Sequence, residues 1–178
     1  MRVLSKNEIT KIIQKGKTMS EKDAAAILDR FERDQPQFYQ AIFGPLSDGI
    51  AELNLDMSCL FLDLCFDIIL IYNKAFGNAP KNTKGKDWFN KKLSLLDLEL
   101  QSISNDIPMS AKFKKRLSDR FVKRSIEAGV QLELFQYLDE QVKNYATFKS
   151  SRKKAIHITN NLLFVIVRLM DDIYSPEK

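Results

Sequence analysis

The most continuously apolar stretch of the chain, residues 55–77, limits the folds that this sequence can adopt. It is long enough for about five or six helical turns, and nearly every position is apolar or small. The exceptions are Asp56, Asp63, Asp67 and Lys74, which a helical repeat places in one narrow line. A helix with so wide an apolar arc is typical of the centre of a protein, where other helices cover most of its sides.

The same stretch is too short and too charged to span a membrane. Its most apolar part, residues 59–72, falls short of the ~20 residues that a transmembrane helix needs. Asp63 and Asp67 would each cost roughly 2.5–3.5 kcal/mol at the bilayer centre, whereas each Leu, Ile or Phe contributes only about 0.3–0.6 kcal/mol. The other strongly apolar run, residues 162–170, is shorter and contains Arg168. The sequence therefore predicts a soluble protein.

Cysteine usage and the N-terminal residues indicate a cytoplasmic protein. The chain begins with polar, helix-like sequence and no apolar segment typical of a secretion signal. Cys59 and Cys65 would lie about 9 Å apart along one helix, beyond the ~7 Å limit for a disulfide. Without a disulfide framework, a reducing compartment is expected, with both cysteines as small core residues.

Length and composition fit one globular domain over residues 1–178. The chain is 44% hydrophobic and 29% charged, and no run of alternating apolar and polar residues predicts a strand. Short helices are expected over residues 5–43: Ser5 and Glu8 form a capping box, and Gly16 is a natural helix stop. Pro36 suits the first turn of another short helix.

The central helix has two candidate caps and a clear end. Ser47 and Asp56 could each cap its start, and the sequence does not decide between them. Gly77 ends the helix, and residues 78–86 follow as a basic loop.

Further helices are predicted over residues 87–104, 111–149 and 152–174. The second is either continuous or broken near residues 125–129. The last mirrors the central helix, because it too is apolar nearly all round. The predicted fold is an all-α, single-domain bundle of about six or seven helices, with the helices at about 55–76 and 152–174 packed together in the middle.

The polar lines of the two central helices allow two arrangements. In one, the helices face each other through these lines, and Asp63 or Asp67 pairs with His157 or Arg168 inside the bundle. Such pairing is required if these charges are buried, because an unpaired buried carboxylate costs several kcal/mol. In the other arrangement, each polar line faces water.

The spacing of Asp63 and Asp67 also suits a metal ion, because two carboxylates at i and i+4 can bind Mg²⁺ or Mn²⁺. A phosphohydrolase-like helical enzyme would need a second acidic set, and the only candidates are Asp171 and Asp172 near a helix end. A di-iron bundle is excluded because His157 is the only histidine. The chain has no P-loop and no G-x-S-x-G or G-x-G-x-x-G motif, and we predict no cofactor.

The net charge of +5 is concentrated in one region. Residues 81–154 carry 17 basic and nine acidic side chains, whereas the flanking regions are slightly acidic. The basic regions 81–124 and 149–154 could neutralise phosphates, with Trp88 available to stack on a base. The residues expected to bind nucleic acid are Lys112, Arg116, Arg120, Lys123 and Arg124.

Interaction with protein is the function that the pattern favours over catalysis. Trp88, Leu95 and Leu98 lie on a strip beside the core face of the helix at residues 87–104, and this strip is either buried or an exposed apolar patch. Two nearly all-apolar helices in so small a chain need more cover than short helices provide, and a symmetric dimer would supply it. We predict a non-catalytic helical protein that self-associates or binds a protein partner. A nucleic-acid-binding protein is the first alternative, and a metal-dependent phosphohydrolase-like enzyme that uses Asp63 and Asp67 is the second.

Overall fold

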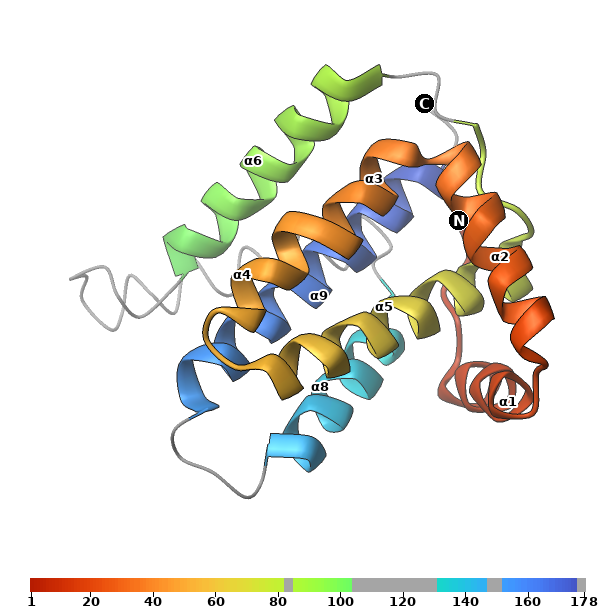
Figure 1. Cartoon of the computed structure of the whole chain (residues 1–178). Coiled ribbons are helices and arrows are strands. Elements are labelled where there is room, and N and C mark those ends of the chain that lie inside the picture. The colour runs from red at the N-terminus through yellow and green to blue at the C-terminus, as the bar shows by residue number, and fades with distance from the viewer. Residues whose placement is uncertain (82–84, 104–130, 147–151, 176–178) are drawn as a thin grey trace.

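A computed structural model of the chain describes residues 1–81, 85–103, 131–146 and 152–175. For residues 86, 96–103 and 146 it describes the backbone alone. These ranges form helices and contain no strand, which confirms the predicted all-α class (Figure 1). In chain order the elements are α1 (Lys6–Lys17), α2 (Glu21–Asp34), α3 (Pro36–Ala41), the kinked turn η1 (Ile42–Leu46), α4 (Ser47–Ala51), α5 (Leu55–Phe76), α6 (Gly85–Ile103), α8 (Leu132–Ala146) and α9 (Lys153–Tyr174).

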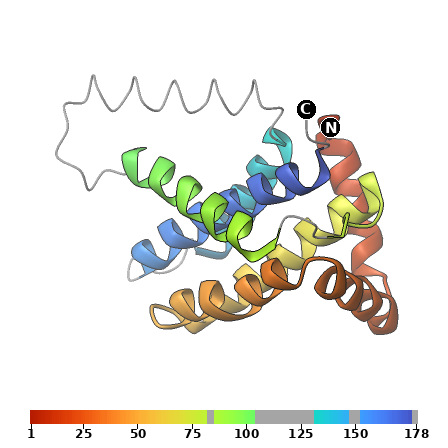
Figure 2. The same cartoon turned by 90° about the horizontal axis from the view of Figure 1, so that it is seen from above.

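The two apolar helices predicted at the centre, α5 and α9, pack against each other (Figures 1 and 2). Phe61 and Ile68 on α5 and Ile166 on α9 are fully buried. Helices α1, α2 and α4 contact α5, whereas α6 and α8 contact α9. The core is therefore built around one pair of helices, as the apolar periodicity indicates.

The long helix α5 begins at a residue that the sequence pattern did not select. The cap is Asn54, whose side-chain Oδ1 accepts a hydrogen bond from the Met57 N–H at 3.0 Å. The prediction of Ser47 or Asp56 is wrong, because Ser47 opens the separate short helix α4 and Asp56 lies within the first turn of α5. The predicted end at Gly77 is confirmed by its φ of 90°, a conformation that favours glycine.

Gly16 has a different role from the predicted helix stop, because α1 continues past it to Lys17. A Cβ atom at position 16 would lie 2.5 Å from Leu70 Cδ2, so the buried Leu70 side chain would have to shift to admit any larger residue. Glycine here allows α1 to approach α5 closely.

The other N-terminal signals are confirmed. The Ser5 N–H donates to Glu8 Oε2 at 2.9 Å, and the Glu8 N–H donates to Ser5 Oγ at 3.4 Å, which completes the capping box. These hydrogen bonds, together with Arg2, lower the pKa of Glu8 to about 2. Pro36 is the first residue of α3.

The first residues of the chain are tied to the start of α8. The buried Gln131 accepts a hydrogen bond from the Leu4 N–H at 2.7 Å and donates one to the Arg2 carbonyl at 2.8 Å.

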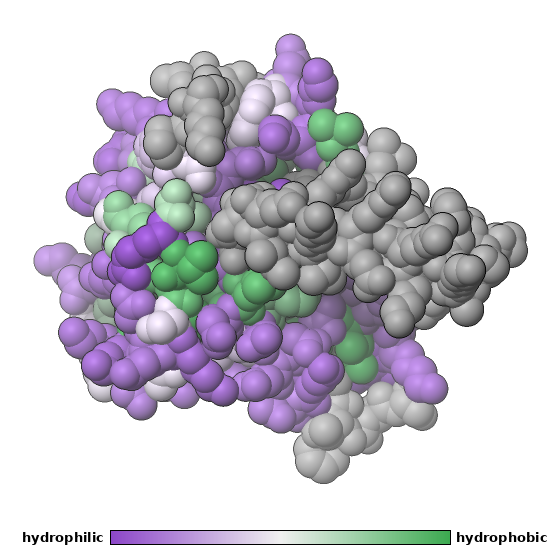
Figure 3. All heavy atoms as spheres, turned by 180° about the vertical axis from the view of Figure 1, so that it is seen from behind, coloured by the Kyte–Doolittle hydropathy of each residue, from purple (hydrophilic) through white to green (hydrophobic). Residues whose placement is uncertain are grey.

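Two further expectations concern the course of the helices. The possible break of the helix near residues 125–129 lies outside the described residues. Within the described ranges, no helix has both the length and the apolar character needed to cross a bilayer. Figure 3 shows a mostly hydrophilic surface with a few apolar groups on the back of the molecule.

Candidate functional site on the outward side of helix α5

One side of α5 carries an apolar strip that the rest of the bundle leaves partly open. Leu55, Cys59, Leu62 and Phe66 are spaced i, i+4, i+7 and i+11, which aligns them along the helix. Leu55 is 69% exposed, Cys59 is also exposed, and Leu62 and Phe66 are half-buried. Together with the adjacent carboxylates Asp56 and Asp63 they form what we call the α5 outer face.

The two carboxylates of the α5 outer face are both exposed, but their surroundings differ. Asp56 accepts a hydrogen bond from Arg152 Nη2 at 2.6 Å, at the start of α9. The Arg152 guanidinium also lies over the Tyr145 ring, 5.4 Å from its centroid. For Asp63, no hydrogen bond or ion pair to another described residue is found. Asp63 is therefore an exposed carboxylate beside the apolar strip, without a basic partner among the described residues.

Asp67, one turn further along α5, is half-buried and hydrogen-bonded. The Tyr137 hydroxyl from α8 donates to Asp67 Oδ2 at 3.0 Å. Burial raises the pKa of Asp67, the Tyr137 hydrogen bond opposes the rise, and the nearby Asp63 adds to it. Asp67 thus belongs to the packing between α5 and α8, whereas Asp63 faces solvent.

The pairing predicted for the two central helices is not among the contacts of the described residues. Asp67 takes Tyr137 as its partner, and no hydrogen bond or ion pair joins Asp63 or Asp67 to His157 or Arg168. His157 is exposed and lies 3.2 Å from Asn161 Nδ2, while Arg168 is half-buried. The outward position of Asp56 and Asp63 follows the alternative in which the polar line faces water.

For the metal site, the described residues contain no group of three or more His, Cys, Asp or Glu side chains placed to hold an ion. Asp171, predicted as part of a second acidic set, is buried and accepts a hydrogen bond from the Tyr72 hydroxyl at 2.6 Å. Asp172 lies 3.1 Å from Lys92 Nζ, in an ion pair between α9 and α6. Each of these carboxylates thus has a partner within the bundle.

The predicted partner-binding strip on α6 is only partly described. Trp88 is half-buried and packs against the core, and Leu95 is 49% exposed. The Leu98 side chain lies outside the described residues, as do the predicted nucleic-acid-binding residues Lys112, Arg116, Arg120, Lys123 and Arg124. Both sites stay predictions.

The apolar part of the α5 outer face was not predicted from the sequence, for a physical reason. On a helix that is apolar nearly all round, the sequence does not show which apolar residues its neighbours cover. The available signal was the acidic line, because exposed carboxylates mark the outward side and Leu55 and Cys59 lie close to that line. Leu55 also directly follows the Asn54 cap, where the chain enters the helix from the surface.

The α5 outer face has the features of a recognition surface. The exposed Leu55 and Cys59 and the half-buried Leu62 and Phe66 provide apolar area that a partner can bury, and carboxylates at the edge of the row favour a partner with positive charges. Comparison of the chain with protein-family models, curated proteins and solved structures finds no match.

Proposed function

We propose that this protein is a non-catalytic α-helical interaction protein that binds another protein through the α5 outer face. The observation that supports this proposal is the 69% exposure of Leu55 in line with the exposed Cys59 and the half-buried Leu62 and Phe66. Single exposed apolar residues are ordinary on protein surfaces, but an aligned row is typical of a binding surface.

The partner that fits this face is a helix with an apolar side flanked by Lys or Arg. Helices that bind to a helical surface use anchors spaced i, i+4 and i+7, which match the spacing of Leu55, Cys59 and Leu62. Lysine or arginine beside those anchors would lie near Asp56 and Asp63, where opposite charges favour association and orient the partner.

The same charges disfavour a symmetric dimer through this face. A two-fold axis brings the same surface of both subunits together, so the interface would hold two copies of Asp56 and Asp63. Arg152 already pairs with Asp56, and the residues of the α5 outer face include no basic side chain to place opposite Asp63. Like charges at an interface oppose association. A basic partner is therefore favoured over a second copy of the same face.

The test uses two synthetic helical peptides with leucines at i, i+4 and i+7, one with flanking lysines and one with glutamates in their place. Fluorescence anisotropy should show saturable binding of the lysine peptide and at least tenfold weaker binding of the glutamate peptide. Leu55→Ser should weaken binding of the lysine peptide about tenfold, since burial of a leucine contributes about 1.5–3 kcal/mol. Asp63→Lys should weaken it several-fold, most at low salt.

The matched control is Leu132→Ser, which removes another exposed leucine, on α8, and should leave binding unchanged. Equal binding of the two peptides, or binding unaffected by Leu55→Ser, would overturn the proposal. Light scattering of the protein alone provides a further check. A dimer that Leu55→Lys abolishes would identify a second copy, not a basic helix, as the occupant of this face.

A further inference from the structure

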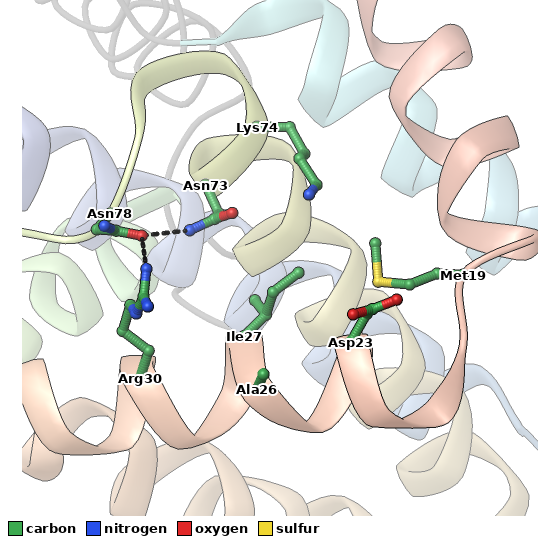
Figure 4. A pocket seen from close by; sticks show the side chains of 8 residues that line it. All are labelled: Met19, Asp23, Ala26, Ile27, Arg30, Asn73, Lys74 and Asn78. Carbon is green, nitrogen blue, oxygen red and sulfur yellow. Dashed lines mark hydrogen bonds between the residues drawn. The ribbon is translucent and has the colours of Figure 1, made fainter.

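A second surface feature, on the other half of α5, is an open hollow with mostly exposed lining residues. It is a hollow of about 300 Å³ between α2 and the last turns of α5 (Figure 4). Its volume is at the lower end of the range of ligand pockets, which is about 300–1,000 Å³. The apolar part of its lining comes from Met19, Ala26 and Ile27. We infer that this hollow binds a small organic anion, a carboxylate or phosphate on a short apolar body.

The positive end of the hollow is organised by Asn78. Its side-chain oxygen accepts hydrogen bonds from Arg30 Nη1 at 2.8 Å and from Asn73 Nδ2 at 3.2 Å, so two helices converge on one amide (Figure 4). A guanidinium has five N–H donors, and Asn78 uses one of those on Arg30. The amide of Asn78 thus holds the guanidinium beside the hollow, while its own NH₂ group is a further donor.

Lys74 adds a second cation to the same hollow. It projects from α5 between the Asn78 end and the Asp23 end (Figure 4). Within the described part of the chain, neither Lys74 nor Arg30 forms an ion pair with a carboxylate. Two cations without a carboxylate partner beside amide donors favour a negatively charged group, and Arg30 in particular suits the two oxygens of a carboxylate or phosphate.

The opposite end of the hollow limits the ligand to a small molecule with its charge at one end. Asp23 lies there, and its Oδ2 accepts a hydrogen bond from Ser20 Oγ at 2.7 Å within the first turn of α2. A second negative group on the ligand would be repelled by Asp23, whereas a hydroxyl or ammonium group would be accepted. Ala26 and Ile27 lie between the two ends and suit a short apolar body.

The test is a set of nuclear magnetic resonance titrations of the full chain with sodium butyrate, sodium phosphate and sodium chloride at constant ionic strength. Butyrate, phosphate or both should produce saturable shifts of the Asn73 and Asn78 side-chain amides and of Arg30 Nε–H. Saturation by butyrate alone identifies a carboxylate ligand, and saturation by phosphate alone a phosphate ligand.

The variants Arg30→Gln and Lys74→Gln should each weaken binding about tenfold, because each removes one charged hydrogen bond. Lys11→Gln removes an exposed lysine of α1 outside the hollow and is the matched control, with unchanged binding expected. Retained peak dispersion shows that each variant is folded. The inference would be overturned if sodium chloride caused the same shifts as butyrate and phosphate. It would also be overturned if the Arg30→Gln, Lys74→Gln double variant bound with unchanged affinity. This site is independent of the α5 outer face.

Discussion

The two sides of helix α5 use the same side-chain pair in different surroundings. On the inner side, Tyr72 donates its hydroxyl proton to Asp171 of α9 at 2.6 Å. On the outer side, Asp67 accepts a hydrogen bond from Tyr137 of α8 at 3.0 Å. Asp171 is 6% exposed, whereas Asp67 is only half-buried. The two pairs differ in depth and in the charges around them, and burial is the largest influence on the pKa of each carboxyl.

The two carboxylates differ in how easily water can reach them. Asp171 Oδ2 is buried and makes no hydrogen bond of normal geometry within the described residues. Burial raises the pKa of Asp171 to about 6, against the opposing effects of the Tyr72 hydrogen bond and of Arg168. Asp67 is near enough to solvent for water to replace a lost partner. Burial also raises the pKa of Asp67, but the inner pair is expected to be the more sensitive of the two to pH and to substitution.

The largest expected contrast between the two sides is in packing. Phe61 on the inner side is fully buried, and Phe61→Ala should lower the free energy of unfolding by about 3–5 kcal/mol, because it leaves a cavity. Leu55→Ala on the outer side should change it by less than about 0.5 kcal/mol. Urea denaturation measures both, and a cost below 1 kcal/mol for Phe61→Ala would contradict the assignment of the inner side as core.

The next contrast is in pH dependence. A pKa raised from 3.8 to about 6 means that folded Asp171 binds its proton more tightly than the unfolded chain does. Its contribution to stability is complete below about pH 4 and is lost as the pH rises through 6, a change of about 3 kcal/mol. Asp171→Asn should remove this pH dependence. Between pH 4 and pH 7, the free energy of unfolding of the variant should therefore rise relative to that of wild type by about 3 kcal/mol, which urea denaturation at each pH measures.

The groups facing Asp171 define the control for this measurement. Tyr72, Arg168, Asp172 and the Gln131 backbone all act on its pKa, and none of them changes in Asp171→Asn. Leu55→Ala, which changes an exposed residue of α5 without a titratable group, is the control and should follow wild type across the same pH range. A flat difference between wild type and Asp171→Asn would show that Asp171 titrates normally.

Removal of the two tyrosine hydroxyls should give a smaller contrast. Tyr72→Phe leaves the buried Asp171 carboxylate without its donor and should cost about 2 kcal/mol at pH 7. Tyr137→Phe should cost less than about 1 kcal/mol, because water can reach the half-buried Asp67. Thermal or urea unfolding of the two variants under identical conditions is the measurement. Equal costs would mean that depth does not separate the two pairs.

The smallest effect is expected at the surface ion pair of the α5 outer face. Asp56 is 58% exposed at its side chain, whereas Arg152 is only 11% exposed. Asp56→Asn should cost less than about 1 kcal/mol, because solvent screens the exposed partner. A double-mutant cycle with Arg152→Gln, repeated in 1 M salt, isolates the pair. A coupling that survives high salt would show that Arg152 holds Asp56 in a less polar environment than its exposure indicates.

The sequence predicted the central architecture well. The helices expected at about 55–76 and 152–174 are α5 (Leu55–Phe76) and α9 (Lys153–Tyr174), packed together as expected. A segment that is apolar on nearly every side has to be buried, so its place in the fold follows from its own residues. The first residue of α5 could not be predicted in the same way. Asn54, Asp56 and Ser47 are all good caps, and the path of the backbone decides among them.

The surroundings of the candidate site were less predictable. The line of Asp56 and Asp63 was visible in the sequence, and facing solvent was one of its two expected arrangements. Its neighbours Tyr137 and Arg152 come from α8 and the start of α9, and no local pattern links them to α5. Gly16 shows the same limit, because its sequence position fits a helix stop but its contact with Leu70 depends on how α1 crosses α5.

The sequence by itself determined that this chain is helical and which two helices lie at its centre, because periodicity and apolar content are properties of consecutive residues. Only the tertiary structure decided which carboxylates are buried and which apolar residues are left open. Tyr72 and Asp171 are 99 positions apart, and Asp67 and Tyr137 are 70 apart. The pKa of a carboxylate and the exposure of a leucine depend on water and on neighbours brought from such distances by folding.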